Sequence, residues 1–144
     1  MKVAIGNDHA GYHLKIRTMK WLEEQGFEVV NYGTDSSDSV DYSDFAHQVA
    51  QVVEDQEYDM GVLICGTGQG VAITANKHPG IRASLCWNPE IAQLARLHNN
   101  SNILCLPGGF MDKEKIFKIL DNFFHTGFEG GRHQRRLSKI PIIS

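Results

Sequence analysis

The sequence predicts a single-domain α/β protein with a three-layer α/β/α, Rossmann-like fold around a five-stranded parallel sheet. Short apolar segments alternate with amphipathic helical segments along all 144 residues, the pattern of βα units. The central segment, residues 60–65, is continuously apolar, as expected for a strand that is covered on both faces. The length is that of one domain, with no internal repeat or linker.

Each predicted element has a local signal. Gly26 stands where the first helix should end, and Asn88-Pro89-Glu90 combines a helix N-cap, a proline at the first helical position and an acid in the first turn. Strands are expected over residues 2–6, 27–32, 60–65, 81–86 and 102–106. Helices are expected over residues 12–25, 43–55, 71–77, 89–98 and 112–125, followed by a basic helical tail at about 128–144.

The composition excludes several classes of protein. Hydrophobic residues make up 42% and charged residues 22%, which excludes a disordered chain or a coiled coil. No apolar run approaches the roughly 18 residues of a membrane span, and the first residues resemble a strand more than a signal peptide. Three widely spaced cysteines, Cys65, Cys86 and Cys105, match neither a disulfide framework nor a zinc site. We therefore expect a cytoplasmic protein with free thiols, no metal and no membrane partner.

Charge is distributed unevenly along the chain. Residues 1–112 carry a formal net charge of −7 and residues 113–144 carry +4. With a pI of about 6.1 the basic end is too small for a nucleic-acid surface, so no nucleic-acid partner is expected. The basic end is nevertheless large enough to bind a small anion such as a phosphate ester.

A glycine-rich loop follows the central strand. Gly66, Gly68 and Gly70 alternate, which lets the backbone turn tightly and brings amide N–H groups close to a ligand at the start of the next helix. The spacing matches neither a P-loop nor a dinucleotide fingerprint. Because ligands of parallel sheets bind beyond the carboxyl ends of the strands, this loop and the Asp8-His9 turn should share one edge.

Cys65 stands at the end of that strand, before the loop. A thiolate facing a helix N-terminus is stabilised and serves as a nucleophile or a proton-transfer base, whereas a buried cysteine elsewhere is a small hydrophobe. For Cys65 both interpretations stay open, and for Cys86 and Cys105 the hydrophobic one is preferred. The Thr67 hydroxyl can donate to a substrate oxygen or accept a local turn hydrogen bond.

The roles of three basic residues, His98, Arg132 and Arg136, are ambiguous from the local sequence. His98 closes a predicted helix, where histidine is common. Arg132 and Arg136 are four residues apart, so on a helix they share a face and can hold a phosphate, or they are two solvated side chains.

The ordered set of motifs resembles the ribose-5-phosphate isomerase type B family, which includes isomerases of galactose 6-phosphate and allose 6-phosphate. The resemblance runs from residue 2 to about 137. The matching segments are Asp8-His9-Ala10-Gly11, Asp41-Tyr42, Cys65-Gly66-Thr67-Gly68, Ala75-Asn76-Lys77, His98-Asn99 and Gly130-Gly131-Arg132-His133.

The resemblance implies interconversion of D-ribose 5-phosphate and D-ribulose 5-phosphate through a cis-enediolate, without a metal or organic cofactor. Cys65 would be the base, Thr67 would assist at the sugar oxygens, His98 would open the ring, and Asp8 would lie near the ring oxygen. The remaining implied contacts to sugar and phosphate are His9, Tyr42, Gly66, Gly68, Gly70, Asn99, Arg132 and Arg136. The implied assembly is a homodimer or a tetramer, with sites shared between subunits.

Some members of the family carry an arginine in the turn after the fifth strand, which is absent from residues 107–110 here. Phosphate binding would then rest on His9, Arg132 and Arg136. The presence of His98 favours a ribose-type enzyme. The alternatives are an isomerase of a six-carbon sugar phosphate and a non-catalytic sugar-phosphate sensor.

Overall fold

The computed structural model describes residues 1–142 and confirms the predicted three-layer α/β fold. The sheet is parallel, in the order β2-β1-β3-β5-β4. Its strands are β1 (Lys2–Asn7), β2 (Glu28–Asn31), β3 (Met60–Cys65), β4 (Ala83–Leu85) and β5 (Ile103–Pro107). The helices are η1 (His9–Gly11), α1 (Tyr12–Glu24), α2 (Tyr42–Glu54), α3 (Gln69–Ala75), α4 (Pro89–Asn99), α5 (Lys113–Phe124) and α6 (Arg132–Leu137).

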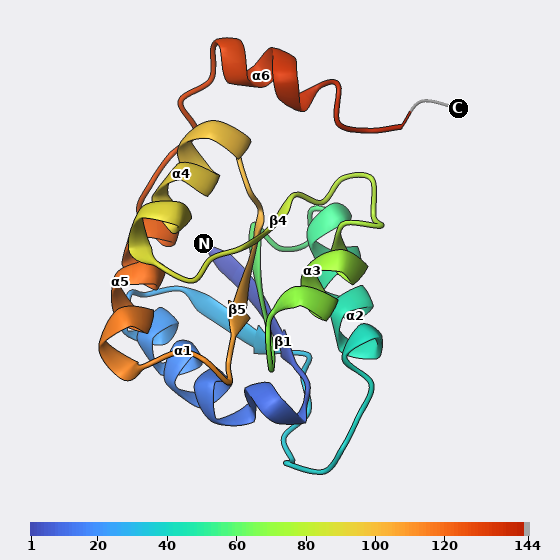
Figure 1. The fold of residues 1–144 in the computed structure, drawn as a ribbon, viewed down its shortest axis with the longest axis vertical. Coiled ribbons are helices and arrows are strands. Elements are labelled where there is room, and N and C mark those ends of the chain that lie inside the picture. Colours follow the sequence, from blue (N-terminus) through green and yellow to red (C-terminus); the bar gives the residue numbers. More distant parts are fainter. Residues whose placement is uncertain (143–144) are drawn as a thin grey trace.

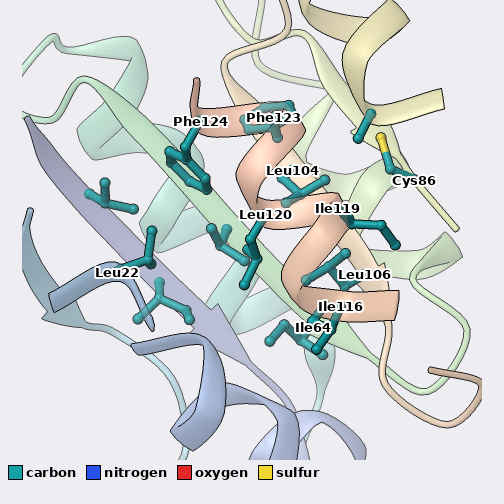
Figure 2. Close-up of a cluster of buried hydrophobic side chains, with 14 of the residues drawn as sticks. Leu22, Ile64, Cys86, Leu104, Leu106, Ile116, Ile119, Leu120, Phe123 and Phe124 are labelled. Atoms are coloured by element: carbon teal, nitrogen blue, oxygen red, sulfur yellow. The ribbon is translucent and has the colours of Figure 1, made fainter. Parts of the chain in front are cut away.

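The two faces of the sheet bury alternate residues of the same strands. Val62 and Ile64 of β3 face the layer formed by α1, α4 and α5, whereas Leu63 and Cys65 face α2 and α3. Figure 2 shows α5 laying its apolar side on the first face, with Leu120 beside Leu104. Both faces are covered, which explains why β3 is continuously apolar.

Most predicted boundaries are confirmed within one or two residues. Gly26 has a positive φ of 86° after α1, and the Asn88 side chain accepts the N–H of Ile91 at the start of α4. Helix α3 begins two residues earlier than predicted, because Gly68, at φ 74°, already makes the turn. The basic tail is helical only over α6, since the chain continues past Leu137 with few neighbours to pack against; residues 143–144 lie outside the described residues.

The strand order reverses between β1 and β3. The chain leaves β1 toward β2 on one side and returns to β3 on the other, so a crevice opens beyond the carboxyl ends of these two strands. Asp8 and Cys65 stand at these ends, and the Asp8 N–H donates to the Ile64 carbonyl at 3.2 Å. The topology therefore places the glycine loop and the Asp8-His9 turn at one edge, as the sequence predicts.

None of the helices within residues 1–142 combines the length and hydropathy needed to cross a bilayer.

A buried lysine holds the long loop after β2. Lys15, on α1, is 1% exposed, and its Nζ donates to the Thr34 carbonyl at 2.6 Å and to Asp35 Oδ1 at 2.7 Å. The hydrogen bonds that Lys15 and Asn31 donate to Asp35, together with the charge of Lys15, hold the pKa of Asp35 below its usual value. The sequence signal for this role is the helical spacing of Lys15 with the buried Thr18 and Leu22.

Replacement of Lys15 by methionine should lower the free energy of unfolding by about 1–3 kcal/mol, because the Thr34 carbonyl keeps only its bond from Asn7 Nδ2 and Asp35 loses its ion pair, while the side-chain volume is kept. Urea denaturation at one fixed protein concentration measures this. The exposed Lys20 of the same helix supplies the control, since Lys20→Met should change stability by no more than about 0.5 kcal/mol. Equal effects of the two substitutions would contradict the role of Lys15.

Candidate active site

One group of predicted site residues gathers at the carboxyl edge of the sheet, and we call it the carboxyl-edge cluster. Its members are Asp8, His9, Tyr42, Cys65, Gly66, Thr67, Gly68 and Gly70. They follow β1 and β3 or begin α2, the elements on either side of the crevice.

Cys65 is the chemical centre of this cluster. It is 4% exposed and belongs to the sheet face that α2 and α3 cover. The turn after β5 binds its backbone, because the Gly108 N–H donates to the Cys65 carbonyl at 2.8 Å and the Gly109 N–H donates to the Gly66 carbonyl at 2.9 Å. The turn that lacks the arginine of some relatives thus holds the cysteine loop in place.

The backbone amides of the loop are available to a ligand. Within residues 1–142 the N–H groups of Gly66, Thr67 and Gly68 make no hydrogen bond. The Thr67 hydroxyl accepts from the Gln69 N–H at 3.3 Å, the local turn bond that its position allows. A row of free amides beside a thiol is an arrangement that stabilises a developing oxyanion next to a base.

Tyr42 and His9 complete the rim of the crevice. The Tyr42 ring lies directly against Gly70, where an added Cβ would be 2.4 Å from its Cε1. His9 Nδ1 accepts the Val40 N–H at 3.2 Å, so in the neutral ring the proton is on Nε2, which is left as a donor.

Asp8 is 6% exposed and has a structural contact as well. Its Oδ1 accepts the N–H groups of Ala10 and Gly11, capping η1 at 3.0 and 3.2 Å. One carboxylate oxygen is therefore committed to holding the turn that carries His9.

The other predicted residues lie at the opposite edge of the sheet. His98 and Asn99 end α4, just before β5 begins, and Arg132 and Arg136 lie on α6, which packs against α4. A strand rises about 3.3 Å per residue, so the six residues of β3 separate the two edges by about 16 Å. Figure 1 shows α6 at the top of the molecule, while β1 and β3 run down and away from it.

This second group also contains Glu129 and His133, which were not predicted as site residues. The His98 and His133 rings stack with centroids 4.4 Å apart and planes 15° apart. Glu129 Oε2 lies 3.8 Å from Nε2 of each ring, and its Oε1 lies 3.7 Å from Arg132 Nη1. We call His98, Asn99, Glu129, Arg132, His133 and Arg136 the amino-edge cluster.

Burial and the positive charge of Arg132 lower the pKa of His133. The sequence feature that could have pointed to Glu129 and His133 is their four-residue spacing around Gly130-Gly131. Both glycines have a positive φ in the structure. The neighbouring Asn99 opens onto a cavity of about 530 Å³ that also contacts Ser84, Ser101 and Ile142.

The other cysteines are structural. Burial raises the pKa of Cys86 to about 12 and that of Cys105 well above its usual value. Both thiols therefore stay protonated, which confirms the preference for small core hydrophobes.

Comparison with known proteins matches residues 3–140 to the sequence pattern of the family described as Ribose/Galactose Isomerase. The chain belongs to this family. It is 45% identical over 142 residues to the Escherichia coli K12 protein named Ribose-5-phosphate isomerase B, covering 99% of this chain and 95% of that one. The resemblance found in the sequence is confirmed, and the chain is an aldose–ketose isomerase.

Solved structures of the family have the same fold. Ribose-5-phosphate isomerase B of Thermotoga maritima superposes with a TM-score of 0.96 at 49% identity, covering 99% of this chain and 98% of that one. The Mycoplasma genitalium enzyme with bound ribulose-5-phosphate gives a TM-score of 0.93 at 44% identity, covering 96% and 93%.

Proposed function

We propose that the protein interconverts D-ribose 5-phosphate and D-ribulose 5-phosphate. The observation that carries the proposal is Cys65 beside the free amides of Gly66, Thr67 and Gly68 at the crevice between β1 and β3. Relatives named ribose-5-phosphate isomerase B support the choice of substrate, and one of them is solved with ribulose-5-phosphate bound.

In the proposed reaction the Cys65 thiolate removes the proton from C2 of the open-chain aldose. The electrons of the C2–H bond form the C1–C2 double bond, and the carbonyl oxygen becomes the enediolate oxygen. The loop amides, with Thr67 at the sugar oxygens, stabilise that charge. The proton of the C2 hydroxyl passes to the C1 oxygen, Cys65 returns its own proton to C1, and the C2 oxygen becomes the ketose carbonyl. No cofactor takes part in this proton transfer.

The phosphate and the closed sugar ring need groups that one chain does not place near Cys65. We propose that the active unit is a homodimer in which His98, Asn99, Arg132 and Arg136 of one subunit face the carboxyl-edge cluster of the other. Two exposed apolar side chains after α6 support an interface beside the amino-edge cluster. Ile140 is 60% and Ile142 is 96% exposed in the single chain. His98 would open the ring, with Asp8 near the ring oxygen. His9 Nε2 and the two arginines would bind the phosphate, and Tyr42 would line the sugar site.

The direct test is an assay of the purified protein on D-ribose 5-phosphate with EDTA present, following the ketose by NMR. We expect conversion with a kcat/KM at least about tenfold above that for allose 6-phosphate or galactose 6-phosphate, because one misplaced carbon costs about 1–3 kcal/mol of transition-state binding. A higher kcat/KM for a six-carbon substrate would assign that sugar instead. Binding without turnover of any of the three would favour the sensor.

The arginines of α6 provide a test of phosphate binding. Arg136→Ala should raise KM about 10- to 100-fold with a small effect on kcat, because a charge-assisted hydrogen bond contributes about 1.5–3 kcal/mol. Arg135→Ala is the matched control, since Arg135 is exposed on the same helix about 100° around from Arg136. A KM increase of the same size in both variants would contradict a specific phosphate contact.

A further inference from the structure

The amino-edge cluster brings three metal-ligating side chains together. His98, Glu129 and His133 each offer one ligand atom, and these three atoms lie within 4.8 Å of one another. Nε2 of each histidine is 3.8 Å from Glu129 Oε2. Two imidazoles and one carboxylate are a donor set that binds zinc in proteins, with a further position left for water.

The buried member of the trio has an unexplained polar atom. His133 is 5% exposed, and its Nε2 makes no hydrogen bond within the described part of the chain. Buried polar atoms are nearly always satisfied, so this nitrogen, aimed at Glu129 and His98, points to a partner that the chain does not supply.

We propose that His98, Glu129 and His133 bind one divalent transition-metal ion of the zinc class per chain. Zinc–ligand bonds of about 2.0–2.1 Å place neighbouring ligand atoms of a tetrahedral site roughly 3.3 Å apart. The observed spacing of 3.8 Å between the carboxylate oxygen and each nitrogen thus exceeds that of a formed site by about half an ångström, and the two stacked rings must also turn so that both nitrogens face the ion.

Backbone hydrogen bonds hold the segments that carry the trio. The Glu129 N–H donates to the Leu97 carbonyl at 3.0 Å, which holds the loop beside His98, and the His133 N–H donates to the Gly130 carbonyl at 3.2 Å. His98 and Glu129 are partly exposed, so an ion can enter from solvent, while His133 forms the floor.

Arg132 has two effects on such an ion. It lies against Glu129 Oε1, which fixes the carboxylate with Oε2 toward the histidines, as the outer partners of metal ligands do. Its charge also opposes a cation, so we expect reversible binding and not a permanent structural metal.

The consequence for activity rests on the proposed function. A bound ion would occupy Nε2 of His98, the group assigned to ring opening. The ion is therefore an inhibitor of the isomerase and not its cofactor.

Cobalt titration of the chelator-treated full-length protein tests the site without any assay of activity. We expect one Co²⁺ per chain, with visible bands of nitrogen and oxygen ligation and without the charge-transfer band of a thiolate. His133→Gln and Glu129→Gln should each raise the Kd at least about tenfold, since removing even a group that only supports a ligand costs 10- to 100-fold. Glu129 is exposed, so its variant keeps the fold, which circular dichroism checks for both.

The chain contains a matched control. His47 Nδ1 lies 2.8 Å from His78 Nε2, but Glu54 lies on the other side of the ring, 3.7 Å from His78 Nδ1, so these three do not converge on one ion. His78→Gln should leave Co²⁺ binding unchanged. No binding at millimolar Co²⁺, unchanged binding in both ligand variants, or a thiolate band that disappears in Cys65→Ala would each overturn the proposed site.

A second arm measures inhibition. Zn²⁺ should slow ribose 5-phosphate isomerisation by the wild type, EDTA should restore it, and Glu129→Gln should need at least about tenfold more Zn²⁺ for the same fractional loss of its own metal-free rate. Binding of Co²⁺ without inhibition by Zn²⁺ would overturn the proposed inhibition. Absence of isomerisation in EDTA would overturn the proposed function, and the cobalt titration would still decide the metal site.

Discussion

Replacement of Cys65 by alanine is expected to lower kcat for ribose 5-phosphate isomerisation by about 10²- to 10⁴-fold, the usual contribution of a positioned proton-transfer group. The reason is local: Cys65 is the thiol beside the free amides of the glycine loop, and within residues 1–142 no other cysteine lies at the crevice. KM should change little, because Cys65 is assigned to proton transfer and makes none of the contacts assigned to the phosphate.

Exchange of the C2 hydrogen separates a missing base from a distorted site. Substrate deuterated at C2 should lose its label to water with the wild type and keep it with Cys65→Ala. Cys86→Ala is the matched control, because Cys86 is buried with a pKa near 12 and cannot serve as a base at neutral pH. Wild-type exchange in Cys65→Ala would reject Cys65 as the base.

Mixing two impaired variants is expected to restore activity, measured at a substrate concentration far below the raised KM of an arginine variant. Cys65→Ala damages the carboxyl-edge cluster, and the double variant Arg132→Ala/Arg136→Ala damages the amino-edge cluster. If each site combines one cluster from each subunit, a hybrid dimer has one doubly damaged site and one intact site. Random pairing of equal amounts makes half of the dimers hybrid, so about a quarter of all sites should be active.

The experiment requires complete subunit exchange, by mixed refolding or by expression of both variants with different tags. The control pairs Cys65→Ala with a chain that carries all three substitutions, a combination in which no site is intact. Recovery only in the first mixture supports shared sites. If neither mixture recovers activity although tagged hybrids are isolated, each chain builds its site alone, and the proposed dimer is wrong.

The elements of the sheet were predictable because their signals are local. The unbroken apolar run of β3, the cap at Asn88 and the glycine after α1 each report the structure of their own neighbourhood. The errors fall where tertiary contact decides: α3 starts early because Gly68 already turns the chain, and the tail is helical only where His133 and Leu137 are buried.

The sequence by itself determined the family, the parallel sheet, and the meeting of Asp8 with the glycine loop, because the carboxyl ends of parallel strands share an edge. The end of α4 with His98 must lie at the amino edge, because a crossover helix returns the chain to the start of the next parallel strand. Only the tertiary structure decided that the arginines of α6 join His98 there. It also decided the stacking of His98 on His133 with Glu129 across both rings. Spacing along the chain does not encode such contacts, because they form between a helix end and a separate turn that pack together only in the folded chain.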